Sequence, residues 1–181
     1  MNTIFLIVGK SGSGKTTIVN RLKIMGSSVE SYTTRPKRTP DERGHIFITE
    51  EQFKCLQNVA AYTFFNGYHY AATQEQVDDS LFYIIDPAGV RFFKEHYKGN
   101  KDIKVVYIES SLSDRLKRLT KRDGLKKALR RIFHDAIAFK GFKKEADTVI
   151  VNQELTLATD KLYRLVKHIK WEEYVKVEGE M

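Results

Sequence analysis

One eight-residue segment, residues 9–16 with the sequence GKSGSGKT, constrains the fold of this chain more than any other. It matches the phosphate-loop pattern G-x-x-x-x-G-K-[ST] at every fixed position. Glycines allow the backbone to curve closely around a polyphosphate, so that its N–H groups form a concave anion-binding nest. The apolar run 3–8 predicts a buried parallel strand before the loop, and residues 16–25 predict a helix after it. A flexible Gly/Ser linker is the plain alternative, but a linker needs neither flanking element.

The residue types in and after this segment suit magnesium-bound ATP. Lys15 can reach the β- and γ-phosphates, and the Thr16 hydroxyl can coordinate Mg²⁺. Asp86 ends the apolar run 81–86 and is a candidate for the acidic residue on the Mg²⁺ side of such a loop. Because Pro87 follows it, Asp86 is equally suited to cap a helix, and the two roles are compatible.

The net charge of +8 is concentrated in one part of the chain. Residues 113–131 contain nine lysines and arginines against only two aspartates, so the remainder is close to neutral. Two basic helical segments that meet at Gly124 indicate a lid that closes over a densely anionic ligand. A duplex-binding face explains so local a charge less well, and nucleic acid is therefore not an expected partner.

The cysteine content and the hydropathy indicate where the protein works. Cys55 is the single cysteine, so no disulfide can form within the chain, and a reducing cytoplasm is expected. The apolar run at the start is too short for a signal peptide, and no stretch is long enough to span a bilayer. We expect a cytoplasmic protein without a membrane partner, as a monomer or a homodimer.

Segments typical of strands and helices alternate along the chain. They predict an α/β fold: a three-layer P-loop core with a parallel sheet, a small inserted mixed α+β subdomain and a helical lid. The core comprises residues 1–33, 81–112 and 132–171, the inserted subdomain residues 34–80 and the lid residues 113–131. A final amphipathic helix precedes a frayed tail at 172–181.

Local patterns add detail to these parts. Thr49 and Thr73 begin capping boxes, and Asn66-Gly67 predicts a tight turn in a hairpin over residues 60–72. Ser111 is expected to cap the first basic helix. The second has an apolar face formed by Leu129, Ile132, Phe133, Ala136 and Ile137.

Over residues 3–170 the chain resembles the guanylate kinases, which belong to the P-loop nucleoside monophosphate kinases. The resemblance is carried by the loop at 9–16, the SYTTR run at 31–35 with Arg38 and Gly44, the hairpin, the DPAG run at 86–89, the arginine-rich lid and the VIVN run at 149–152. It implies a single domain that transfers the γ-phosphoryl group of ATP, with Mg²⁺, to a nucleoside monophosphate. GMP or dGMP is the expected acceptor.

The resemblance also implies roles for individual residues. Ser31 would contact the acceptor base, and its phosphate would be held by Arg35, Arg38 and Tyr70. Charge on the transferring group would be neutralised by Lys15, Arg118, Arg122 and Arg131. Thr16 and Asp86 would lie on the Mg²⁺ side, and Asn152 near the adenine. The ATP-binding residues would be Gly9, Ser11, Gly12, Ser13, Gly14, Lys15, Thr16, Thr17 and Asn152.

The chain departs from the family where the guanine base is read. Ala61 and Ile84 stand in place of two acids that accept hydrogen bonds from guanine, and Phe47 replaces a phosphate-binding tyrosine unless that tyrosine is deleted. Loss of such acceptors predicts weaker or altered acceptor selectivity. Glu75, or another acid of the subdomain, could substitute for them.

Three other functions remain to be weighed. The first is a kinase for a different phosphorylated acceptor. The second is a non-catalytic guanylate-kinase-like binding module, although such modules lack the working phosphate loop that this chain has. The third is a GTPase switch, suggested by Asn100-Lys101-Asp102, but the aspartate comes one residue early for N-K-x-D, and a helix stop explains this run better.

Overall fold

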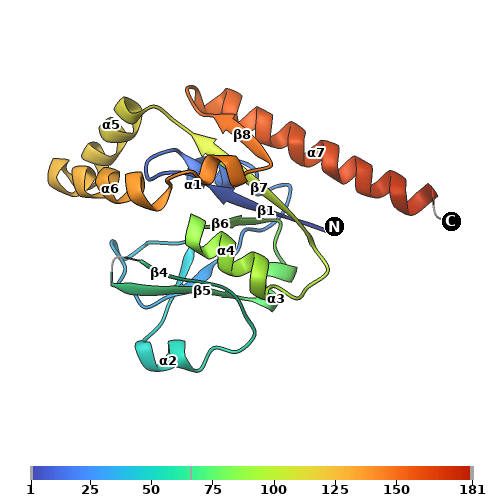
Figure 1. Ribbon diagram of the computed structural model, residues 1–181, viewed down its shortest axis with the longest axis horizontal. Coiled ribbons are helices and arrows are strands. Elements are labelled where there is room, and N and C mark those ends of the chain that lie inside the picture. Colours follow the sequence, from blue (N-terminus) through green and yellow to red (C-terminus); the bar gives the residue numbers. More distant parts are fainter. Residues whose placement is uncertain (1, 66, 180–181) are drawn as a thin grey trace.

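The computed structural model describes residues 2–65 and 67–179 of the chain. Within them two four-stranded sheets occupy different parts of the molecule (Figure 1). The larger sheet is entirely parallel, with the strand order β6-β1-β7-β8. Its strands are β1 (Thr3–Val8), β6 (Phe82–Ile84), β7 (Asp102–Glu109) and β8 (Thr148–Val151). The predicted α/β class with a parallel sheet is confirmed.

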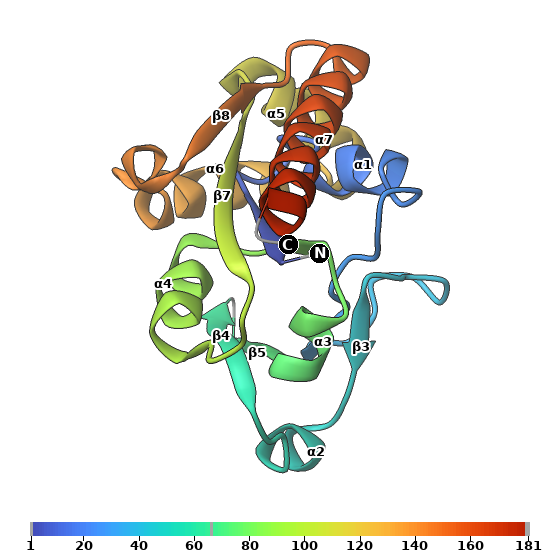
Figure 2. The ribbon, with the colours of Figure 1, turned by 90° about the vertical axis from the view of Figure 1, so that its right-hand side faces the viewer.

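Helices cover both faces of the larger sheet, because the buried strand β1 is apolar on both sides. Phe5 and Ile7 pack with residues of α1 (Lys15–Arg21) and α7 (Leu155–Gly179). Leu6 and Val8 face the other way, toward residues of α4 (Pro87–His96). Figure 2 shows α4 on the opposite side of β7 from α1 and α7. The core therefore has the three layers that the sequence predicts.

The smaller sheet is mixed and has the order β3-β2-β5-β4. Its elements are β2 (Ser31–Thr33), β3 (His45–Phe47), β4 (Val59–Phe65) and β5 (Tyr68–Thr73), with the short helices α2 (Glu50–Lys54) and α3 (Gln74–Asp78). The predicted hairpin is the antiparallel pair β4–β5, while Asn66 of its turn lies outside the described residues. Thr49 and Thr73 both form their predicted capping boxes.

The chain enters this smaller sheet earlier than the sequence predicts. Residues 1–33 are expected to belong to the core, but Ser31–Thr33 pairs with β3 and β5 of the smaller sheet. Only Ser28 contacts the larger sheet as a strand would, through an isolated parallel bridge to Phe82. The place beside β1 is taken by β6, so the segment at 31–33 is free to begin the second sheet.

Two basic helices, α5 (Leu112–Asp123) and α6 (Leu125–Ala138), follow β7 and meet at Gly124. Ser111 caps α5 as predicted, because its hydroxyl accepts a hydrogen bond from the Asp114 N–H at 3.1 Å. Gly124 has a φ of +81°, a left-handed conformation that glycine adopts without strain. The chain can therefore turn between the two helices without a longer loop. A short 3₁₀ helix, η1 (Phe142–Glu145), then leads to β8.

The apolar face predicted for α6 is not its buried face. Leu129, Phe133 and Ile137 are 51%, 72% and 67% exposed, whereas Ala128 and Asp135 are buried. The prediction is wrong because the spacing of apolar residues sets the buried face of a helix only where no polar side chain on another face has a buried partner. Asp135 points inward to an ion pair, and the apolar residues consequently point outward.

The final helix is also longer than predicted. The tail at 172–181 was expected to fray, but α7 continues to Gly179. The carboxylate of Glu173 accepts hydrogen bonds from the backbone N–H of Asn2 and the hydroxyl of Thr3, which ties the helix to the start of β1. Even at this length α7 is not apolar enough to cross a membrane, and no other helix of the described ranges is.

Candidate active site

The phosphate loop connects the carboxyl end of β1 to the first turn of α1. Its glycines are required by the backbone and by close neighbours. Gly14 caps α1 with a φ of +95°, and a Cβ there would collide with the amide of Asn152. Gly12 has a φ of +78°, and its Cβ would lie 3.1 Å from the backbone oxygen of Arg115. The loop is thus wrapped by neighbours that leave space only for glycine.

Lys15 folds back over the loop instead of extending into solvent. Its Nζ donates hydrogen bonds to the backbone oxygens of Gly9 and Lys10. Burial of the ammonium group lowers the pKa of Lys15 to about 8, although the carboxylate of Asp135 acts in the opposite direction. The ammonium is therefore a poorly solvated cation next to the loop, which favours an anion as its partner.

A cavity of about 380 Å³ opens over the loop. The four predicted catalytic cations, Lys15, Arg118, Arg122 and Arg131, all line it, together with Ser11, Gly12, Gly14, Thr16, Thr17 and Leu119. No acidic side chain is among the described residues of this lining. A cavity walled by cations and glycine backbone suits a polyphosphate.

The lid arginines have partners within the chain. The Arg122 guanidinium donates to the Asp123 carboxylate at 2.9 and 3.1 Å, and Arg131 lies 3.4 Å from the same oxygen. Burial acts to raise the pKa of Asp123, but these two cations outweigh it and lower that pKa. Arg118 donates to the backbone oxygen of Gly12 at 3.1 Å, so α5 also contacts the loop directly.

Three of the predicted ATP-binding residues lie outside this cavity. Ser13 is a buried residue of the loop itself, and Gly9 lines a neighbouring cavity. Asn152 is 1% exposed, and its amide nitrogen donates to the backbone oxygen of Ser13 at 2.7 Å. Asn152 therefore supports the loop from below, and its contact with an adenine stays a prediction.

The predicted Mg²⁺ ligands lie on either side of Lys15. Thr16 lines the loop cavity, and Asp86 lines the neighbouring one. Asp86 caps α4 by accepting from the Gly89 N–H at 2.7 Å, and its other oxygen accepts from the Thr63 hydroxyl at 3.1 Å. Among the described residues no three His, Cys, Asp or Glu side chains form a metal cluster. This sparse donor set fits Mg²⁺, which binds through substrate phosphates and one or two protein oxygens.

The neighbouring cavity has a volume of about 220 Å³ and lies between the two sheets. Of the predicted acceptor residues, Ser31, Arg38 and Tyr70 line it. Ser11 and Lys15 line both cavities, so the two meet at the phosphate loop. His45, a weaker candidate for the acceptor site from the sequence, also lines it; its Nδ1 lies 3.0 Å from the Ser31 hydroxyl.

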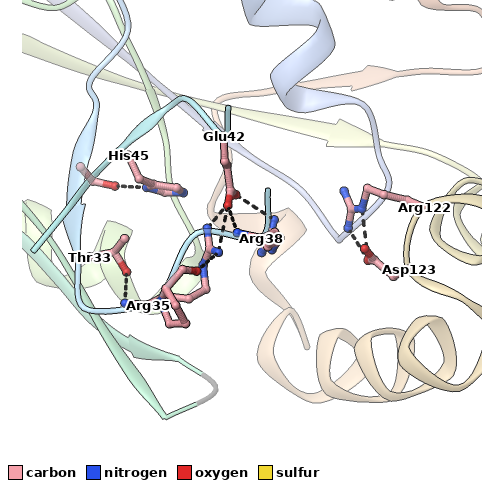
Figure 3. Close-up of polar contacts among 9 residues, drawn as sticks. Thr33, Arg35, Arg38, Glu42, His45, Arg122 and Asp123 are labelled. Carbon is pink, nitrogen blue, oxygen red and sulfur yellow. Dashed lines mark hydrogen bonds and ion pairs between the residues drawn. The ribbon is translucent and has the colours of Figure 1, made fainter. Parts of the chain in front are cut away.

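Arg35 does not line this cavity, because Glu42 holds it elsewhere. Its side chain is 8% exposed, and its guanidinium forms two hydrogen bonds with the Glu42 carboxylate, at 2.8 and 3.2 Å (Figure 3). Glu42 also accepts from the Arg38 backbone N–H at 2.6 Å. Burial acts to raise the pKa of Glu42, but these hydrogen bonds outweigh it and lower the pKa to about 2. An acid seven residues after Arg35 gave no signal of this contact in the sequence.

The positions that lack the expected acids lie in different surroundings. Ile84 lines the acceptor cavity, whereas Ala61 is 1% exposed and packs in the core. Two carboxylates do line the cavity, but Asp86 is bonded as above and Asp135 pairs with Arg115. Glu75 is not among the described residues of the lining; it accepts from the Asn58 amide at 2.8 Å.

Comparison with known proteins identifies relatives of the chain. The family model described as guanylate kinase matches residues 1–169. A guanylate kinase of Koribacter versatilis is 41% identical over 59 residues, which cover 30% of this chain and 25% of that protein. One of Alkalilimnicola ehrlichii is 27% identical over 169 residues, covering 84% of this chain and 81% of that protein. The crystal structure of guanylate kinase from Anaplasma phagocytophilum has a TM-score of 0.62 at 21% identity, over 93% of this chain and 87% of that one, and so shares the fold.

Proposed function

Because the chain belongs to the guanylate kinase family, we propose that it transfers the γ-phosphoryl group of ATP to a nucleoside monophosphate, with GMP or dGMP as the acceptor. One observation carries this proposal. The cation-lined loop cavity and the acceptor cavity share Ser11 and Lys15, so two bound anions would meet at the loop. Phosphoryl transfer needs this kind of alignment, together with positive charge on the transferring group.

In the loop cavity, backbone N–H groups and Lys15 would bind the β- and γ-phosphates. Arg118, Arg122 and Arg131 would add charge on the side of the lid. Arg122, which is hydrogen-bonded to Asp123, and Arg131, which forms an ion pair with it, would exchange this carboxylate for phosphate oxygens. Thr16 and Asp86 would hold Mg²⁺, which when bound neutralises charge on the β- and γ-phosphates.

In the acceptor cavity, Arg38 and Tyr70 would hold the phosphate of the monophosphate and Ser31 would contact its base. Arg35 would take part only if its guanidinium turns away from Glu42. The smaller sheet already contacts α6, because the ring centroid of Phe65 at the end of β4 lies 4.5 Å from that of His134. Movement of the lid over the two cavities would exclude water from the transferring group.

The chain's composition supports the remaining parts of the proposal. We place the protein in the cytoplasm, since Cys55 is its single cysteine. Its partners would be small nucleotides, bound by a monomer or a homodimer. We assign residues 113–131 as the lid and the smaller sheet with its helices as the acceptor-binding subdomain.

A steady-state assay of ADP formation from ATP and Mg²⁺, with each common monophosphate in turn, tests the proposal. GMP or dGMP should give the highest kcat/KM. Lys15→Ala should lower kcat/KM by about 10³-fold, since it removes a charge from the transferring group. Lys10→Ala, at a variable position of the same loop, should stay within about threefold of the wild type. Failure of every monophosphate to stimulate ADP formation would overturn the proposed function.

A further inference from the structure

Two side chains outside the assigned site form a buried ion pair behind the phosphate loop. Arg115 lies on α5 and Asp135 on α6, and their closest N–O distance is 2.8 Å. The two side chains are only 5% and 2% exposed. Charges this deeply buried are rare in proteins unless they are paired and hydrogen-bonded further.

Both members of the pair also form hydrogen bonds with one residue, Ser11. Asp135 accepts from the Ser11 backbone N–H at 2.6 Å and from its hydroxyl at 3.1 Å. Arg115 donates from Nε to the Ser11 backbone oxygen at 2.9 Å. The pair therefore binds the donor, the acceptor and the hydroxyl of a single loop residue, which fixes the orientation of the two peptide groups next to it.

The contact occurs where the nucleotide cavities meet. Ser11 lines both of them, and Asp135 lines the acceptor cavity beside Lys15. The next residue, Gly12, packs against the backbone of Arg115 and accepts from Arg118. A shift of α5 or α6 would thus move the loop at the point where the triphosphate has to bind.

We propose that Arg115 and Asp135 are positioning residues, which hold the first turn of the phosphate loop in the conformation that binds ATP. Neither contacts the reacting atoms; they act through Ser11. The carboxylate of Asp135 also opposes the loss of the proton from Lys15, because its negative charge acts on that ammonium more strongly than that of Asp86. The inference rests on the proposed function only in naming ATP as the ligand.

A purely structural role would make a different prediction. Replacing both members of a buried ion pair with apolar residues of similar volume is often neutral or stabilising, whereas removing one member strongly destabilises. An apolar pair could therefore fill the same space and preserve the fold. It could not bond to the N–H, the oxygen or the hydroxyl of Ser11, and only the positioning role would then be lost.

The double variant Arg115→Met/Asp135→Leu separates the two roles. Its melting temperature should stay near that of the wild type. Calorimetry with Mg-ATP alone should give an affinity about tenfold weaker, because three hydrogen bonds that orient the loop are gone, all of them to charged groups. Hydrogen exchange at the Ser11 amide should be faster. Wild-type values of both ATP affinity and exchange in a folded double variant would overturn the proposal.

A matched pair elsewhere provides the control. Arg91 and Glu145 form an exposed ion pair of 2.6 Å between α4 and η1. Arg91→Met/Glu145→Leu likewise replaces an arginine and a carboxylate with Met and Leu, and should leave the ATP affinity and the exchange of Ser11 within about twofold. If this control variant binds ATP as weakly as the buried double variant does, the effect comes from the loss of surface charge, and the proposal is overturned.

Asp135→Asn provides a second test if the double variant does not fold, because the amide oxygen can still accept from Arg115 and the arginine keeps a hydrogen-bond partner. This substitution keeps the shape of the side chain and one acceptor oxygen but removes the negative charge. Hydrogen exchange at the Ser11 amide should therefore still be faster than in the wild type. The KM for ATP should rise more than the KM for the acceptor. Equal changes in both KM values with unchanged exchange would overturn the inference. If the wild type binds ATP but phosphorylates none of the acceptors, the proposed function is overturned and the positioning role is not. The positioning role is tested by ATP affinity and hydrogen exchange, and both can be measured without turnover.

Discussion

The Glu42 carboxylate binds the Arg35 guanidinium through two parallel hydrogen bonds, as a phosphate would bind the same group. It also accepts from the Arg38 backbone N–H, and the Arg38 guanidinium lies 3.6 Å from the same carboxylate, so one side chain pairs with both arginines expected to bind the acceptor. A phosphate bound by these arginines would therefore compete with a carboxylate whose pKa is lowered to about 2.

Glu42→Gln should lower the KM for GMP, by about three- to tenfold, with kcat little changed. The amide keeps one hydrogen bond to Arg35 but removes the negative charge that repels the incoming phosphate. Steady-state kinetics with GMP as the varied substrate measure this effect. Glu75→Gln, an exposed acid of the same subdomain, is the control. A higher KM in Glu42→Gln would mean that Glu42 orients the arginines for the substrate.

ATP affinity should fall as the pH rises above about 8, because burial lowers the pKa of Lys15 to that value. Loss of the proton removes the charge that faces the phosphates, and the limiting slope is about tenfold per pH unit. Lys15→Arg, whose guanidinium stays protonated, should give a flat profile over the same range. Calorimetry between pH 6.5 and 9.5, about 1.5 units either side of this pKa, provides the measurement.

The titration of Lys15 affects the stability of the fold in the opposite direction, so unfolding cannot account for a loss of ATP affinity at high pH. The folded-state pKa of Lys15 lies below its ordinary value of 10.5, so between pH 8 and 10.5 the unfolded chain binds more protons at this residue. The contribution of Lys15 to the free energy of unfolding therefore increases with pH in that window. A weaker ATP complex there, with an unchanged or higher melting temperature, would be the expected combination.

Arg131→Ala should lower kcat by about 10²–10³-fold, because it removes a charge from the lid side of the loop cavity. Arg130→Ala is its matched control, since Arg130 is the adjacent residue, is exposed and does not line that cavity. Single-turnover kinetics would separate this loss from changes in nucleotide binding. Equal effects of the two substitutions would show that the net charge of the lid matters more than the position of Arg131.

Ile84→Asp should raise the preference for GMP over AMP, by about tenfold or more, because it places a hydrogen-bond acceptor in the wall of the acceptor cavity. The wild type should discriminate less, since both carboxylates that line this cavity are already bonded. Ile84→Val preserves the apolar wall and is the control. An unchanged ratio of kcat/KM values would place the base elsewhere.

The sequence predicts best what depends on neighbouring residues. The phosphate loop, the capping boxes at Thr49 and Thr73 and the hairpin each follow from local spacing, and the structure contains all of them. The parallel sheet followed from the alternation of elements. These features need no knowledge of distant contacts.

Contacts between distant residues explain what the sequence did not predict. Asp135 lies 20 residues from Arg115 and 124 residues from Ser11 along the chain. These contacts direct the face of α6 that carries Asp135 toward the interior and leave its apolar face exposed. Glu173 bonds to Asn2 across 171 residues, which keeps the end of α7 helical. Arg35 was expected in the acceptor site, and a single carboxylate of the same loop keeps it out of the cavity. No periodicity in the sequence encodes such partners.

The outward ridge on α6 has a consequence for the behaviour of the purified protein. Leu125, Leu129, Phe133 and Ile137 project from a helix that also carries Lys126, Lys127 and Arg130. At low ionic strength these cations keep copies of the chain apart, and added salt shortens the range of that repulsion to a few ångströms. Concentrated salt should therefore promote association of copies through these exposed apolar side chains, so that the protein is expected to be most soluble in dilute buffer.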